Sequence, residues 1–257
     1  MRSFSLASVI LSYFLVAGGL FAALLALAYM HVTSEAGGYL MLGCGAFAGG
    51  LIAARASRGS TIIEPAIGGL AVIGTVVALV ATSDVGNMLW INAHDQTLRA
   101  IVLLAASSGV GALVGAWIGE SQFGPATLSP APWFIYTAFA TFGACVIVSM
   151  IVGVLFATGR VCGEVKELGQ VVLLGIAAGC LLAGLAVGAS ARSRPLLASL
   201  VGGAAGVAGF CFLLSRAATT DRDQLTGLIA LSVAGGVVTL IGTLLGWIVV
   251  GRRLAGT

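Results

Sequence analysis

Apolar and polar positions alternate along this chain in long blocks, and the apolar blocks number eight. They cover residues 7–30, 37–54, 62–82, 100–119, 133–158, 169–190, 195–215 and 225–250. A hydrocarbon layer about 30 Å thick takes about 20 apolar residues to cross, and most of these runs have that length. No run shows the period-2 alternation of a membrane barrel strand, and a backbone in lipid must satisfy its own hydrogen bonds. The pattern predicts an all-α integral membrane protein with eight transmembrane helices.

The composition supports the same class. Of the 257 residues, 59% are hydrophobic and only 8% are charged. A soluble domain carries about 25% charged residues, so this chain has too few to cover a surface that faces water. No basic patch is large enough for nucleic-acid binding. The expected surroundings are a lipid bilayer, and the expected protein partner is another membrane protein or a second copy of the chain.

Charges separate between the two sides of the predicted membrane. If eight helices alternate in direction, seven basic residues fall on one side: Arg2, Arg55, Arg58, Arg192, Arg194, Arg252 and Arg253. Five fall on the other side, together with seven acids: Glu35, Asp84, Asp95, Glu164, Glu167, Asp221 and Asp223. Lys and Arg in short loops favour the cytoplasm, so both termini are predicted there. The glycine-rich helices and their arginine turn resemble small bacterial membrane proteins, which implies a bacterial cytoplasmic membrane.

A linker with three prolines divides the chain nearly in half. It occupies residues 120–132, between a first unit at 1–119 and a second at 133–257. Adding 134 carries Gly45 to Gly179, Gly50 to Gly184, Arg58 to Arg192, and Gly68-Gly69 to Gly202-Gly203; for the last helices an offset of 131 pairs Gly111 with Gly242 and Gly115 with Gly246. The first helices align poorly. We expect two four-helix repeats that, having an even number of helices, run parallel about an axis along the membrane normal.

Glycines recur four residues apart within the runs, on one face of each predicted helix. The set is Gly45, Gly49, Gly111, Gly115, Gly119, Gly175, Gly179, Gly184, Gly188, Gly242 and Gly246. Helices in lipid gain nothing from hydrophobic burial against each other, so close backbone approach at small residues has to hold them together. These glycines are predicted to mark helix contacts within the chain. A docking face for another subunit, best represented by Gly111, Gly115 and Gly119, is the alternative.

Ionisable residues inside the runs are scarce. Glu64, at the start of the third run beside Pro65, is the strongest candidate, but Thr61-Ile-Ile-Glu64 also fits a capping box for that helix. The basic turns holding Arg55 and Arg58, and Arg192 and Arg194, suit anionic lipid headgroups. The five cysteines show no CxxC spacing, and four lie inside apolar runs, which favours plain packing residues over a disulfide framework or metal site.

The outer side carries the remaining candidates. His31, Glu35, His94 and Asp95 together offer two imidazoles and two carboxylates, which a metal ion would accept, although interfacial histidines are commonly only solvated groups. Residues 83–98 have a much shorter counterpart in the second half. This segment, with Met88, Trp90 and His94, is predicted to be interfacial or re-entrant, or else a loop that docks a partner.

No catalytic constellation can be assembled from these residues. Neither histidine lies in a membrane span, and HExxH, P-loop and Rossmann patterns do not occur. We therefore predict no enzyme activity and no cofactor. The favoured function is a non-catalytic subunit or scaffold of a membrane complex. The alternative is a permease or channel for a neutral or hydrophobic solute along the pseudo-twofold axis, lined by groups such as Ser107, Ser108, Thr141 and Ser149.

Overall fold

The computed structural model describes residues 5–31, 34–56, 62–123, 132–158, 168–191, 195–215 and 222–255. All the regular secondary structure in these ranges is helical. The helices are α1 (Leu6–Met30), α2 (Glu35–Ala56), α3 (Ile63–Ala81), α4 (Asp84–Asn92), α5 (His94–Phe123), α6 (Trp133–Ala157), α7 (Leu168–Ser190), α8 (Leu196–Ser215) and α9 (Arg222–Ala255).

Eight of these helices, all except α4, are long and apolar enough to cross a membrane. The predicted all-α class and the predicted count of eight membrane helices are therefore confirmed. The sequence did not predict α4, nine residues long, which forms within the polar segment 83–98. It also placed the start of the fourth span too late, because α5 begins at His94 and carries Asp95 in its first turn, where a negative charge stabilises the helix dipole.

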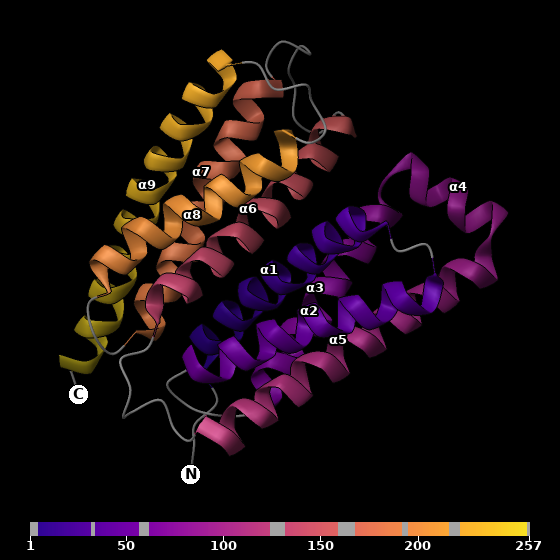
Figure 1. Cartoon of the computed structure of the whole chain (residues 1–257), viewed down its shortest axis with the longest axis horizontal. Helices are drawn as coiled ribbons and strands as arrows, with labels where there is room; N and C mark the ends of the chain where they lie inside the picture. Colours follow the sequence, from indigo (N-terminus) through magenta and orange to yellow (C-terminus); the bar gives the residue numbers. More distant parts are fainter. Residues whose placement is uncertain are drawn as a thin grey trace.

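The helices form two groups of spans, α1, α2, α3 and α5 in one and α6 to α9 in the other (Figure 1). Within the first group α1 packs on α2, α2 on α5, α5 on α3 and α3 on α1; α6, α7, α9 and α8 make the matching circuit in the second. The two groups meet chiefly where α1 packs on α6. Helix α1 begins and α9 ends at the same end of the molecule (Figure 1).

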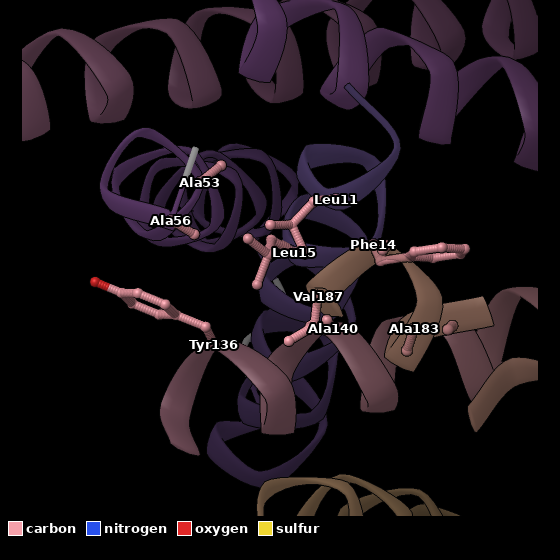
Figure 2. Packing of buried hydrophobic residues seen from close by; sticks show 11 residues of the cluster. Leu11, Phe14, Leu15, Ala53, Ala56, Tyr136, Ala140, Ala183 and Val187 are labelled. Atoms are coloured by element: carbon pink, nitrogen blue, oxygen red, sulfur yellow. The ribbon is translucent and has the colours of Figure 1, made fainter. Parts of the chain in front are cut away.

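Three clusters of buried apolar side chains fill the interior. One lies mainly in the first group of spans and includes Val16, Leu20 and Val72, while another lies mainly in the second and includes Phe142, Val146 and Phe210. The third joins the groups, with Leu11 and Leu15 of α1 lying beside residues of α2, α6 and α7 (Figure 2). The boundary between the groups is therefore a packed core.

The outside of the molecule is apolar as well. Leu40, Leu174 and Leu197 are 71%, 70% and 79% exposed, and many other large apolar side chains project outward from the spanning helices. Such a surface is stable only against hydrocarbon, since a soluble protein rarely exposes large contiguous apolar patches. The outward faces are in contact with a lipid bilayer.

Candidate functional site

A glycine contact between α1 and α6 joins the two groups. A Cβ atom added at Gly18 would collide with the carbonyl oxygen of Phe139, and one added at Gly143 would collide with the carbonyl oxygen of Phe14. The contact is reciprocal: the glycine of each helix meets the phenylalanine carbonyl that lies four residues before the glycine of the other. This is the pattern of an isologous twofold interface. We call this contact the central seam.

Within the first group, glycines of the predicted set lie at helix contacts. Gly45 and Gly49 of α2 lie against the α1 backbone. Gly111, Gly115 and Gly119 of α5 lie against α2, where a Cβ at Gly115 would collide with the carbonyl oxygen of Phe47. The face of α5 offered above as the best subunit-docking candidate is thus occupied by α2 of the same chain.

Glycines of the second group also lie at helix contacts. Gly184 and Gly188 of α7 meet the backbone of α9, and Gly242 and Gly246 of α9 meet the backbone of α7. Gly179 lies against Cys145 of α6: a Cβ added at Gly179 would be 3.0 Å from the Cα atom of Cys145. Gly175 is packed less tightly, because an added Cβ would be 3.6 Å from Ser149, an ordinary van der Waals distance. Backbone contact therefore extends along both helix pairs.

The contacts of the last helices correspond in a register that differs from the predicted one. Gly115 of α5 contacts Phe47 and Leu51 of α2, and Gly242 of α9 contacts Leu181 and Leu185 of α7. Leu181 and Leu185 are the residues that the offset of 134 pairs with Phe47 and Leu51. Gly115 therefore corresponds to Gly242, an offset of 127 rather than the predicted 131. The error is one helical turn. It arose because the glycines of α5 repeat every four residues, so a shift of one turn still places glycine opposite glycine.

The first helices, which align poorly by sequence, also make corresponding contacts. Gly68 of α3 lies against Ser12 and Tyr13 of α1, and Gly202 of α8 lies against Thr137 and Ala138 of α6. This gives an offset of 125 between α1 and α6, the same offset that relates Gly18 to Gly143.

Thr61, the first residue of the predicted capping box around Glu64, lies outside the described residues. The residue before α3 makes no side-chain cap, and the Glu64 side chain is fully buried. Its Oε1 atom instead accepts a hydrogen bond of 2.8 Å from the backbone N–H of Ser5, the N-cap residue of α1. A carboxylate near a helix N-terminus is favourable, so Glu64 stabilises the start of α1 from a neighbouring helix. Its position is explained by structure without invoking proton transfer.

Of the basic turns, only Arg55 lies within the described residues, in the last turn of α2. A cation is favourable at that end of a helix. Arg58, Arg192 and Arg194 lie outside the described residues.

The four outer candidates for a metal site are not gathered. His31 ends α1 in a left-handed conformation with φ 49° and donates its backbone N–H to Leu27 O. Glu35 begins α2, while the His94 ring lies 4.0 Å from Trp90 in an edge-on contact at the start of α5. Across the described parts of the chain, no three His, Cys, Asp or Glu residues are close enough to hold a metal ion.

The segment predicted to be interfacial or partner-docking carries α4, which packs on α3 and α5 (Figure 1). Met88, Trp90 and Ile91 are 67%, 48% and 79% exposed. The Ser83 hydroxyl accepts a hydrogen bond from the Gly86 N–H and fixes the first turn of the helix. Helix α4 therefore has an exposed apolar face and lies between the end of α3 and the start of α5.

The hydroxyl groups named as a solute path are dispersed. Ser108 is buried between α5 and α3, where its hydroxyl donates to Gly69 O at 3.3 Å. Thr141 lies against Gly206 of α8, and Ser149 lies near Gly175 of α7. The Ser107 hydroxyl donates to Leu104 O within its own helix. These residues belong to different helix interfaces and do not face one another.

Sequence reasoning missed the meeting of three cysteines. Cys145 of α6, Cys180 of α7 and Cys211 of α8 are all buried in the core cluster of the second group. The Sγ atoms of Cys145 and Cys180 are 3.7 Å apart. The residues are separated by 35 and 31 positions in sequence, so only the helix crossings bring them together. Cys44, by contrast, is exposed.

No family model, curated protein or solved structure matches this chain.

Proposed function

We propose that this protein is a non-catalytic scaffold subunit of a membrane complex, built from two parallel four-helix repeats. The repeats are related by a pseudo-twofold axis along the membrane normal, and both termini lie in the cytoplasm of a bacterial cell. The observation that carries the proposal is the central seam, where Gly18 and Gly143 make reciprocal backbone contacts. The matched circuits of helix contacts in the two groups support the repeat.

The seam supports the scaffold in preference to the permease. A path along the pseudo-twofold axis would pass between α1 and α6, where backbone atoms of the two helices touch. Leu11, Leu15 and Val187 fill the adjoining space and are at most 1% exposed. The hydroxyl groups that would line a path are spread over separate interfaces. Tight packing at the axis favours a rigid support over a conduit.

We propose that the protein is not an enzyme because of where its reactive side chains lie. The Glu64 carboxylate accepts a hydrogen bond from the Ser5 N–H, and His31 and His94 lie at helix ends. An enzyme working on a membrane substrate requires titratable groups that converge on the reacting atoms. Within the ranges that the structure describes, we find no such convergence.

For the partner, the proposal assigns the exposed face of α4, formed by Met88, Trp90 and Ile91. This helix has no counterpart among the described residues of the second group, and neighbouring helices cover only part of it. A partner membrane protein that crosses the bilayer beside α3 and α5 would meet this face at the membrane boundary. Trp90 suits that place because tryptophan is enriched at interfaces between proteins and between membrane and water.

The test is native mass spectrometry of the protein extracted in a mild detergent or in lipid nanodiscs. We expect a second membrane polypeptide at a fixed stoichiometry, lost when Met88 and Ile91 are changed to Ala. The control is Leu174→Ala, which trims an equally exposed side chain on the second group of spans. A complex that survives the α4 double variant contradicts the assignment of α4. Proteoliposomes of the chain alone that swell in glycerol or urea faster than empty liposomes contradict the scaffold and favour the permease.

A further inference from the structure

Two thiols in the interior of the second group are in van der Waals contact. Cys145 and Cys180 are fully buried, and their Sγ atoms are 3.7 Å apart. The Cys145 thiol also donates a weak hydrogen bond to Ile176 O at 3.8 Å. Cys145 is near the middle of α6 and Cys180 near the middle of α7, so the pair lies at the depth of the hydrocarbon layer.

The same positions of the first group contain no sulfur. The offset of 125 between α1 and α6 pairs Cys145 with Leu20, and the offset of 134 pairs Cys180 with Ala46 and Cys211 with Val77. All three counterparts lie in or against the equivalent apolar cluster of the first group. The core at this level is thus packed satisfactorily by hydrocarbon side chains alone, and packing does not account for three cysteines from three helices.

We propose that Cys145 and Cys180 form a redox pair that a lipid-soluble quinone oxidises to a disulfide linking α6 to α7. The two helices are close at this level, because a Cβ added at Gly179 of α7 would lie 3.0 Å from the Cα atom of Cys145. A bridge requires Cα atoms within about 7 Å and an S–S bond of about 2 Å. Small rotations of the two side chains would bring the sulfur atoms together from their present contact.

The reaction balances without leaving a charge in the membrane. Two S–H bonds break and one S–S bond forms, while two electrons and two protons pass to the quinone and give the hydroquinone. Thiols, disulfide, quinone and hydroquinone are all neutral, so no uncompensated ion remains in a medium where a buried charge is very costly. A quinone is the class of acceptor that fits, since it is dissolved in the layer where the pair lies.

Burial sets the rate. Both thiols are enclosed, so oxidation has to wait for a local separation of the helices. N-ethylmaleimide added to the folded protein in membranes should therefore label Cys145 and Cys180 only slowly.

The experiment treats the reconstituted full chain with decylubiquinone, whose fully substituted ring cannot add thiols. The protein is then denatured with excess N-ethylmaleimide, without reductant, and its mass is measured. The untreated chain should take five labels, one for each cysteine. The oxidised chain should take three and yield one hydroquinone per chain, and its digest should contain a peptide linking Cys145 to Cys180 that a dithiol reductant separates.

Two variants use the residues found at the matching positions of the first group. Cys211→Val keeps the pair, so its labels should fall from four to two on oxidation. Cys180→Ala removes one partner, so four labels should remain. Retention of five labels by the oxidised natural chain, with no hydroquinone formed, overturns the proposal. A linked peptide that contains Cys211 in place of either partner overturns it as well.

Discussion

The central seam is tested most sharply by replacing Gly143 with Ala. The added Cβ would lie 2.5 Å from the Gly18 nitrogen and closer still to the Phe14 carbonyl oxygen, where ordinary contact begins at 3.4 Å. Both obstacles are backbone atoms and cannot rotate away. The helices α1 and α6 therefore have to separate by about 1 Å at this point, which costs the dispersion contacts on both sides of the seam.

Gly153 provides the matched control in the same helix. A Cβ added there meets nothing within 4 Å. Alanine improves helix propensity by roughly 1 kcal/mol at either position, so the difference between the two variants isolates the collision. Overpacking of a close-fitting interior costs about 1–3 kcal/mol, and Gly143→Ala should be less stable than Gly153→Ala by that amount.

The assay is reversible unfolding in mixed detergent micelles, with the free energy of unfolding measured for each variant. Because the seam is reciprocal, Gly18→Ala should match Gly143→Ala, and the double variant should cost less than the sum of the two. A free energy for Gly143→Ala equal to that of Gly153→Ala would refute direct packing at the seam.

Two further predictions concern other contacts. Gly115→Leu should separate α5 from α2 and lower the free energy of unfolding by at least about 3 kcal/mol, because the side chain would collide with backbone atoms of Phe47 and Leu51. Unfolding in the same micelles measures this loss. Wild-type stability of the variant would contradict the α2–α5 contact. Glu64→Ala should free the Ser5 N–H and destabilise the start of α1 by about 0.5–2 kcal/mol, seen as faster amide hydrogen exchange in the first turn of α1 alone. Unchanged exchange there would show that the carboxylate does not hold that helix.

The eight membrane helices could be predicted because hydropathy over about 20 residues is a local property of the sequence. Helix α4 could not, because its nine residues mix polar and apolar side chains without a long run. Its first turn is held by the Ser83 hydroxyl, and its apolar face remains exposed, so no burial pattern marks it.

Glycine spacing predicted which residues touch a neighbour but left open which neighbour. Four-residue spacing shows which face of a helix makes contacts, whereas the helix that it contacts depends on how the eight membrane helices pack. From the sequence alone, the face with Gly111, Gly115 and Gly119 could have contacted either an external subunit or α2. Only the packing of the helices shows that it contacts α2. The same spacing hides a shift of one turn, which is why the predicted offset for the last helices was wrong.

Side chains that meet across helices were the least predictable. Glu64 fits a capping pattern for α3, yet its carboxylate accepts a hydrogen bond from the Ser5 N–H at the start of α1. Cys145 and Cys180 have no motif, since their contact depends on the crossing of α6 and α7 at Gly179. A sequence signal did exist for the second case: three buried cysteines lie in one half, at positions where the other half has Leu, Ala and Val.

The account depends most on an even number of membrane crossings, with the start of α1 and the end of α9 on the same side. Reporter fusions before Met1 and after Thr257, one active only in the cytoplasm and one only outside it, measure this directly. We predict that both ends activate the cytoplasmic reporter. Activity of the two ends in opposite compartments would contradict the parallel repeats, the seam between them and the position assigned to α4.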